Sequence, residues 1–477
     1  MPASFKKIFT LLCAGLFGCA LAKCATNNIP AQRPNILFII ADQWRAEAFG
    51  FAGNPDVKTP NLDRLQGEGI DFRNAISTVS VCSPTRASLM TGQRALTHGV
   101  FVNDVPLSPA ATTLSKVLHQ AGYDTGCIGK WHVDGHGRSV FIPQERRQEF
   151  DYWKVLECTH EYTSSHYYAT TTNLLKWNGY DVVAQTQDAA RYLRNHAHAK
   201  KPFFLYLSWG PPHNPYQTAP PAFRSMYHEA KLRVRPNVPA GQQGATKTNL
   251  AGYYAHCTAL DSCAGTLLQT LRENGLETNT LVIFTSDHGD MLGSHGLSSK
   301  QQPYDESIRV PLLMRWPGAL GNQPKQLDAL FCSSDFMPTI LGLCGIAVPA
   351  TVEGMDYSGY IQGGVDPSDG ASLISCPVPF GEYSREHGGR EYRGIRTTRY
   401  TYVRDLNGPW LLFDNELDPA QMHNLAGHPE FANLQALLEE RLLKKLADAK
   451  DQFLPAQHYL NQWGYKLNAA GTIPYTP

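Results

Sequence analysis

Continuous apolar runs alternate along the chain with segments whose apolar residues recur at helical spacing. The runs 35–40, 202–209 and 280–286 predict buried strands, because both faces of each strand are apolar. Residues 113–121 predict a helix with a threonine cap and a stop at Gly122. This alternation predicts an α/β fold with a large, mostly parallel central sheet flanked by helices.

The pattern changes at about residue 376. Residues 394–403 alternate as antiparallel strands do, and 410–413 predict a strand that enters a turn. One amphipathic core helix is marked by Leu434, Leu437, Leu438, Leu442 and Leu446. We therefore predict a catalytic α/β domain over 33–375 and a smaller C-terminal α+β subdomain with an antiparallel sheet over 376–477.

The first 24 residues predict a signal peptide or a lipoprotein leader. Lys6 and Lys7 precede the apolar run 8–22, which is too short for a membrane span and ends in a small-x-small cleavage pattern. Cys19 and Cys24 each follow an imperfect lipobox, so a lipid anchor is the alternative. Both readings predict an exported protein: periplasmic, cell-surface or secreted. The sequence shows no internal transmembrane span.

Charge and cysteine content further limit the classes of protein to which this chain can belong. The 477 residues carry 42 Lys and Arg against 42 Asp and Glu, without a basic patch, which argues against a nucleic-acid partner. Of eleven cysteines, three lie in the leader region, and the remaining eight show neither CxxC pairs nor a dense framework. We expect most of these eight to be buried apolar residues, with one or two disulfides.

Polar residues directly follow the three predicted strands. These are Asp42-Gln43, His213 after two prolines, and Asp287-His288. Ligands of open α/β sheets lie beyond the carboxyl ends of the strands, so we expect these groups to converge. Two carboxylates and an amide oxygen suit Ca²⁺ or Mg²⁺, whereas the histidine leaves a transition metal open. A single strand-end aspartate more often serves only a turn.

A second set of residues could hold an oxyanion. Cys82 stands at the predicted start of a helix, where an anion is favoured, and Arg86 lies one turn further on the same face. Lys130 and His132 stand at the predicted end of another strand, and Lys300 follows His295 in the segment 293–300. Around one metal, these groups would form a pocket for sulfate or phosphate. From these residues alone, Cys82 could equally pair in a disulfide or act as a thiol nucleophile.

Six motifs, in order, resemble those of one enzyme family. Residues 82–86, Cys-Ser-Pro-Thr-Arg, resemble the Cys-x-Pro-x-Arg signature of type I sulfatases in the alkaline phosphatase superfamily. The other five are the segments 34–42, 129–132, 211–213, 285–289 and 300–312. The resemblance extends from residue 33 over the rest of the chain, and it is greatest to bacterial carbohydrate sulfatases.

The resemblance implies that a sulfatase-maturing enzyme oxidises Cys82 to formylglycine (3-oxoalanine). The hydrate of this aldehyde would attack sulfur, and its second hydroxyl would allow sulfate to be eliminated without attack by water. Ca²⁺ would be held by modified Cys82 with Asp42, Gln43, Asp287 and His288. Gln43 departs from the family, in which many members carry a second aspartate, so weaker cation binding is expected.

The resemblance also implies roles for the other motif residues. Arg86 and Lys130 would stabilise the hydrate, and His132 would accept the second proton during elimination. His213 would protonate the leaving alcohol, and Lys300 would clamp the sulfate.

The implied activity is hydrolysis of an O-sulfate ester on a sulfated sugar of a host or algal glycan, with a galactose-type residue as one guess. Candidate sugar contacts lie in variable loops, where ordinary surface residues are equally expected. They are Asp104, His136, Arg138, His160, His166, His295, Arg385 and His387. The alternatives are a formylglycine phosphonate or phosphodiester hydrolase, and a non-catalytic protein that binds sulfated glycans.

Overall fold

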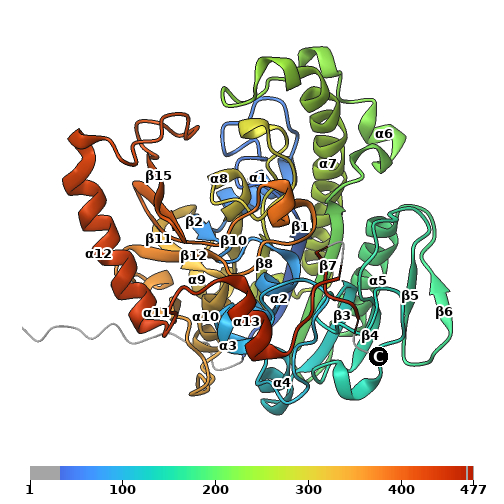
Figure 1. Cartoon of the computed structure of the whole chain (residues 1–477). Coiled ribbons are helices and arrows are strands. Elements are labelled where there is room, and N and C mark those ends of the chain that lie inside the picture. Colours follow the sequence, from blue (N-terminus) through green and yellow to red (C-terminus); the bar gives the residue numbers. More distant parts are fainter. Residues whose placement is uncertain (1–32, 469–470, 476–477) are drawn as a thin grey trace, which may run out of the picture.

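The computed structural model describes residues 33–468 and 471–475, which form two β-sheets with surrounding helices (Figure 1). The predicted leader lies outside the described residues. The large sheet is mostly parallel at its centre and the second sheet is antiparallel, so the predicted fold class is confirmed.

The large sheet has eleven strands in the order β11-β2-β10-β8-β1-β7-β3-β4-β5-β6, with β9 paired to β2. Its central strands β8, β1, β7, β3 and β4 run parallel, and the buried apolar sequences of β8, β1 and β7 predicted this for those three. The bounds are β1 Asn35–Asp42, β2 Ile70–Ile76, β3 Asp124–Lys130, β4 Tyr152–Leu156, β5 His166–Tyr168, β6 Leu174–Lys176, β7 Phe203–Pro212, β8 Thr280–Ser286, β9 Arg309–Val310, β10 Leu312–Arg315 and β11 Lys325–Cys332.

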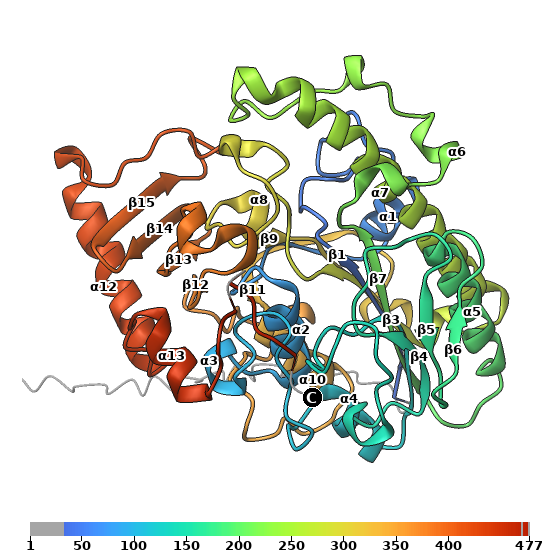
Figure 2. The ribbon, with the colours of Figure 1, turned by 45° about the vertical axis from the view of Figure 1, so that its right-hand side comes forward.

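Helices cover both faces of this sheet, because successive side chains of a strand point to opposite faces. Ile36, Phe38 and Ile40 of β1 join a core with α2 (Cys82–Thr91), α4 (Leu114–Gln120) and α10 (Phe336–Leu343). The intervening Leu37 and Ile39 join a second core with α1 (Pro60–Gly67), α5 (Asp181–Asn195) and α7 (Gln243–Glu273). The sheet is therefore the middle of three layers (Figure 2).

The predicted cap of the helix near residue 114 forms in the structure. The Thr113 side chain accepts a hydrogen bond from the backbone N–H of Lys116 at the start of α4, which satisfies one of the otherwise free donors there. The remaining short helices are α3 Ala95–His98, α6 Pro221–Arg224, α8 Asp305–Ile308, α9 Pro317–Leu320, α11 Ser358–Ile361 and α13 Ala456–Trp463.

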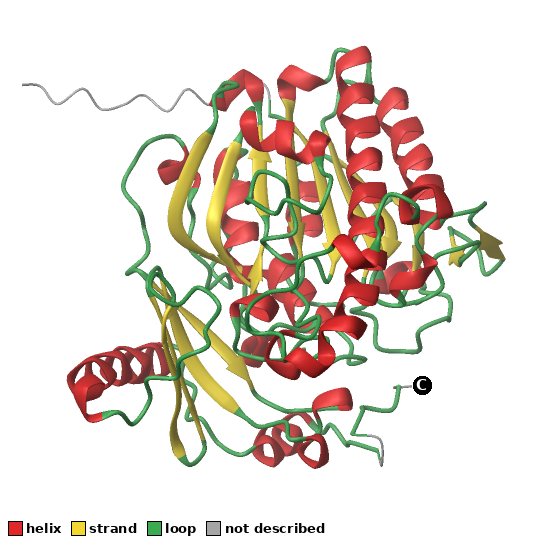
Figure 3. Cartoon of the chain, turned by 90° about the horizontal axis from the view of Figure 1, so that it is seen from above, coloured by secondary structure: helices red, strands yellow, loops and turns green. Residues whose placement is uncertain are grey.

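The second sheet has four antiparallel strands in sequential order and carries one long helix, α12 (Ala432–Asp448), on one face (Figure 3). Its strands are β12 Ala371–Cys376, β13 Tyr392–Thr397, β14 Tyr400–Asp405 and β15 Gly408–Asp414. Leu438, Leu442 and Leu446 are buried against the sheet, as predicted. The prediction was wrong for Leu437, which is 56% exposed, because the helical register turns it away from the sheet.

The two sheets share a hydrophobic cluster. Ile76, Ile308 and Leu330 from the large-sheet side pack with Ile374 and Val403 of the small sheet. The second sheet begins with β12, and the separation of the chain into two domains near residue 376 stays a prediction.

The eight cysteines among the described residues are all free, so the predicted one or two disulfides do not form there. Seven are buried and one, Cys332, is half-buried, in line with their expected packing role. Within the described residues, every helix is too short or too polar to cross a membrane.

Candidate active site

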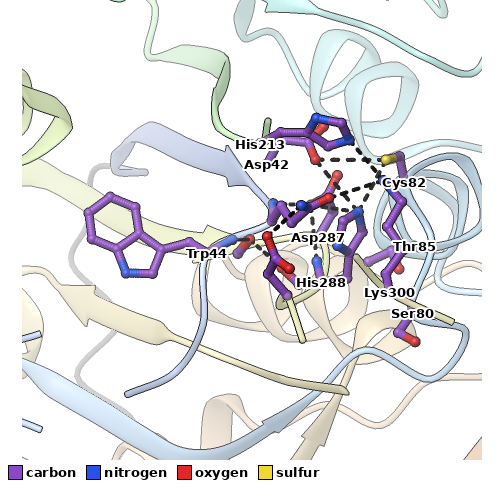
Figure 4. Close-up of polar contacts among 12 residues, drawn as sticks. Asp42, Trp44, Ser80, Cys82, Thr85, His213, Asp287, His288 and Lys300 are labelled. Atoms are coloured by element: carbon purple, nitrogen blue, oxygen red, sulfur yellow. Dashed lines mark hydrogen bonds and ion pairs between the residues drawn. The ribbon is translucent and has the colours of Figure 1, made fainter. Parts of the chain in front are cut away.

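Three neighbouring strands end at one place on the large sheet. Asp42 is the last residue of β1, Asp287 follows β8, and His213 follows β7. Because β8, β1 and β7 are adjacent and parallel, their carboxyl ends meet at one edge, as the sequence predicted. Figure 4 shows these side chains gathered around Cys82, while the ring of Trp44 points away from the cluster.

Cys82 is the first residue of α2, and its side chain points into the cluster. Its Sγ lies 3.1 Å from His288 Nε2 and 3.7 Å from Asp42 Oδ1. Burial and the Asp42 charge raise the pKa of the Cys82 thiol, but Lys130, Lys300 and His288 outweigh them and hold this pKa well below its usual value. The site therefore stabilises negative charge at the position of this side chain.

Four side chains offer ligand atoms for one cation. The ligand atoms of Asp42, Cys82, Asp287 and His288 lie within 4.8 Å of one another, and all four residues are buried. Two carboxylates supply the hard oxygen donors that Ca²⁺ prefers. The cysteine sulfur occupies the position that an oxygen would take after conversion to formylglycine, so this set of donors fits a Ca²⁺ site.

Gln43 borders this cluster but is engaged elsewhere. Its Nε2 donates to Asp290 Oδ2 at 2.7 Å, and its Oε1 accepts from Lys300 Nζ at 3.1 Å. Its backbone has φ of 70°, a left-handed conformation that is uncommon for a residue with a side chain. Its predicted role as a metal ligand stays a prediction.

The cations of Arg86 and Lys130 pair with the carboxylates of Asp42 and Asp287. Arg86 Nε donates to Asp287 Oδ2 at 2.9 Å, and Lys130 Nζ lies 2.5 Å from Asp42 Oδ2. Burial raises the pKa of Asp42, but the charges of Lys130, Arg86 and His288 lower it well below its usual value. Asp287 shows the opposite balance, because burial and the neighbouring Asp42 charge raise its pKa. The pair can thus hold two negative charges only while cations surround it.

Lys300 and His213 form a hydrogen-bonded pair above Cys82. His213 Nδ1 donates to the Asn214 carbonyl at 2.8 Å, so the neutral ring accepts at Nε2, where Lys300 Nζ lies 2.9 Å away. Burial and the Lys300 charge lower the pKa of His213 well below its usual value. The proton of this pair therefore resides on Lys300 until another group takes it.

His132 lies between Asp104 and Cys158. Its Nε2 is 3.3 Å from Asp104 Oδ1, and its buried Nδ1 has no hydrogen-bond partner among the described residues. Burial lowers the pKa of His132, but negative charge on Cys158 and the bond to Asp104 raise it well above its usual value. His132 is therefore held as an imidazolium, which must lose its own proton before it can accept another.

A cavity of about 340 Å³, called the catalytic pocket below, is lined by Cys82, Lys130, His132, His213 and Lys300 among others. Of the predicted sugar contacts, Asp104, Arg138 and His160 line it. Arg138 is fixed by two bonds to Asp104, of 3.1 and 2.8 Å, and the His160 ring stacks on His213 with centroids 4.5 Å apart.

The other five predicted sugar contacts lie outside the catalytic pocket. His136 Nδ1 bonds to the Asp134 carbonyl, and His295 stacks on Tyr304 with ring centroids 4.0 Å apart. Arg385 pairs with Glu391, His387 bonds to Ser384, and His166 is exposed on β5. A polar loop residue can satisfy its hydrogen bonds locally, which sequence does not reveal.

Sequence reasoning missed part of the pocket wall. Phe380, Gly381, Glu382 and Thr472 enter it from the C-terminal part of the chain, and no motif marks them. Asn214, Ser299 and Gln301 were also missed, although each adjoins a predicted catalytic residue and could have been found by that adjacency.

Comparison with known proteins gives consistent matches. A family model described as Sulfatase matches residues 34–346, and one described as N-sulphoglucosamine sulphohydrolase, C-terminal, matches residues 293–448. An ulvan-active sulfatase of Formosa agariphila is 42% identical over 447 residues, covering 93% of this chain and 87% of that protein.

Two further matches involve Bacteroides thetaiotaomicron, one in sequence and one in structure. An endo-4-O-sulfatase is 30% identical over 466 residues, covering 86% of this chain and 90% of that protein. A solved structure from work on glycosaminoglycan metabolism in this bacterium is 28% identical with a TM-score of 0.80, covering 90% of this chain and 99% of the other.

Proposed function

The chain belongs to the sulfatase family, and we propose that it removes O-sulfate groups from a sulfated polysaccharide. One observation carries the proposal: a buried cysteine at a helix N-terminus faces two carboxylates and three cations at the ends of parallel strands. Because its relatives include an ulvan-active sulfatase and an endo-4-O-sulfatase, ulvan and sulfated glycosaminoglycans are the first substrates to test.

We propose Ca²⁺ as the resident ion, held by Asp42, Asp287, His288 and the formylglycine formed from Cys82. When bound, the ion would supply positive charge that lowers the pKa of a hydroxyl on residue 82. Gln43 could complete the set through the second lone pair of its carbonyl oxygen, whose first accepts from Lys300.

The cations suit a sulfate ester. Arg86, Lys130 and Lys300 outnumber the carboxylates Asp42 and Asp287, and the N-terminus of α2 adds partial positive charge. An anionic substrate is needed to balance this excess. Lys300 and Lys130 both line the catalytic pocket, so their ammonium groups are placed to bind sulfate oxygens.

The pair of Lys300 and His213 supplies the proton for the leaving alcohol. His213 is neutral and accepts from Lys300 Nζ, so the proton available to this pair is held on the Lys300 ammonium, and both residues line the pocket. His213 thus works as a general acid together with Lys300, rather than by itself. His132 would act in the elimination step once its proton has been lost.

We also propose that the protein is exported and matures by oxidation of Cys82, which involves a sulfatase-maturing enzyme as partner. The apolar run 8–22 after two lysines supports export. In protein from its native host, we expect an N-terminus after residue 22, or at a lipidated cysteine, and a peptide mass at residue 82 that matches formylglycine or its hydrate. Unmodified cysteine throughout would remove the nucleophile.

The activity is tested by measuring sulfate release from ulvan and from chondroitin sulfate by matured protein, with phosphate diesters as competitors. We expect sulfate esters to be preferred. A preference for phosphodiesters would instead favour the phosphonate or phosphodiester hydrolase, and glycan binding without sulfate release would favour a non-catalytic binding protein. Cys82→Ala provides the inactive control, because a methyl side chain has neither the thiol nor a hydroxyl from which the aldehyde could form.

A further inference from the structure

A second cavity, of about 530 Å³, adjoins the catalytic pocket. We call it the side groove; it is lined by Arg138, Ser139, Leu156, Cys158, Thr159, Glu161, His160, His166 and Leu174. Arg138 and His160 line both spaces, so the groove and the pocket are adjacent and meet at these two side chains. Both volumes lie within the range of roughly 300–1,000 Å³ typical of small-molecule sites.

The two shared residues are held in place from the catalytic side. Asp104 accepts from Arg138 Nε and Nη2, while Nη1 makes no hydrogen bond to any described residue. The His160 ring stacks on His213, and its Nε2 lies 4.0 Å from Cys158 Sγ. Fixed side chains with free donors are suited to orient a ligand that reaches from one space into the other.

The far wall of the side groove is the hairpin of β5 and β6 at the edge of the large sheet. Leu174 is 51% exposed there, and His166 offers an exposed imidazole whose side chain bonds to no described residue. Ser139, Thr159 and Glu161 add hydroxyl and carboxylate groups. A sugar presents one apolar face of C–H groups and a rim of hydroxyls, and this wall matches both.

We propose that the side groove binds the sugar residue next to the sulfated one, so that the protein recognises at least two consecutive sugars of a chain. The inference rests on the proposed sulfatase function. Its two contact regions are the guanidinium of Arg138 at the junction with the catalytic pocket and the β5–β6 hairpin opposite. Glycan length then contributes to the rate of desulfation.

The test compares three kinds of substrate for matured enzyme: sulfated oligosaccharides of ulvan and of chondroitin sulfate, a sulfated monosaccharide cut from each, and 4-nitrophenyl sulfate. For the wild type, we expect kcat/KM at least tenfold higher for the oligosaccharides than for the monosaccharide. Equal values would overturn the proposal while the sulfatase function stands. Absence of sulfate release from all three would refute the function and, with it, this inference.

Variants locate the effect in the groove. Leu174→Ser removes the apolar contact and Ser139→Trp obstructs the groove; each should lower the ratio of oligosaccharide to 4-nitrophenyl sulfate kcat/KM about tenfold. Leu175→Ser is the matched control, because Leu175 is the next residue of β6, is 37% exposed and does not line the groove. An unchanged ratio in both variants, or an equal fall in the control, would overturn the proposal.

Discussion

A buried ion pair joins the small sheet to the segment that carries Lys300, and its removal should destabilise the protein measurably. Arg396 on β13 donates from Nε and Nη2 to the two oxygens of Asp305, both at 2.9 Å, and Asp305 opens α8 five residues after Lys300. Arg396→Met leaves the Asp305 carboxylate buried with one weaker partner, Arg309 Nη1 at 3.3 Å.

The size of the effect follows from this geometry. Breaking a buried pair by removing one partner costs about 3–5 kcal/mol, and because Arg309 remains, we expect about 3 kcal/mol. For a chain of this length, roughly 1 kcal/mol corresponds to one degree, so Tm should fall by about 3 °C. Because the Lys300 segment is tied to this pair, sulfate release should fall as well.

The assay is urea and thermal denaturation of the wild type, Arg396→Met, Asp305→Asn and the double variant. We expect the double variant to be at least about 1 kcal/mol more stable than the sum of the single losses predicts. Arg399→Met is the matched control: Arg399 also pairs with a carboxylate, Asp414, but is 45% exposed and should matter little. Additive losses, or an equal loss in the control, would refute the reasoning.

The pH dependence gives a further check on the same pair. Burial raises the pKa of Asp305, but Arg396 and Arg309 lower it below its usual value of 3.8. A depressed carboxyl pKa stabilises the folded state above the unfolded pKa, and this contribution is lost as the pH falls below about 4. The loss in Arg396→Met should therefore be the same at pH 7 and pH 5 and shrink at lower pH.

Two more predictions concern the active site. Asp104→Asn weakens the bond that helps raise the pKa of His132, so the pH midpoint of kcat/KM assigned to this histidine should move to lower pH. Asp134→Asn is the control and should leave this midpoint unmoved, because Asp134 pairs with Arg146 outside the pocket. Gln43→Asp loses the hydrogen bond to Asp290, which should lower the free energy of unfolding by about 2 kcal/mol without Ca²⁺. The added negative charge should nevertheless tighten Ca²⁺ binding, measured by calorimetry. Unchanged Ca²⁺ affinity would show that residue 43 is not a ligand.

The central strands and the chemistry at their ends could be predicted from the order of residues alone. A parallel strand buried on both faces is a continuous apolar run, and the polar residues that follow it in sequence also follow it in space. Asp42, His213 and Asp287 could therefore be placed at one edge of the sheet from this pattern. Cys82 at the start of α2 was equally local, since a helix start is set by neighbouring residues.

Long-range packing, in contrast, selects which of the variable residues reach the pocket. Arg138 lines the pocket because Asp104, 34 residues earlier, binds its guanidinium. Arg385 forms an ion pair with Glu391 instead. Phe380 to Glu382 arrive from the C-terminal part of the chain because Phe380 packs in the core of the large sheet and its backbone bonds to Gln301. Loop positions depend on such long-range contacts and carry no periodic pattern, so sequence spacing could not predict them.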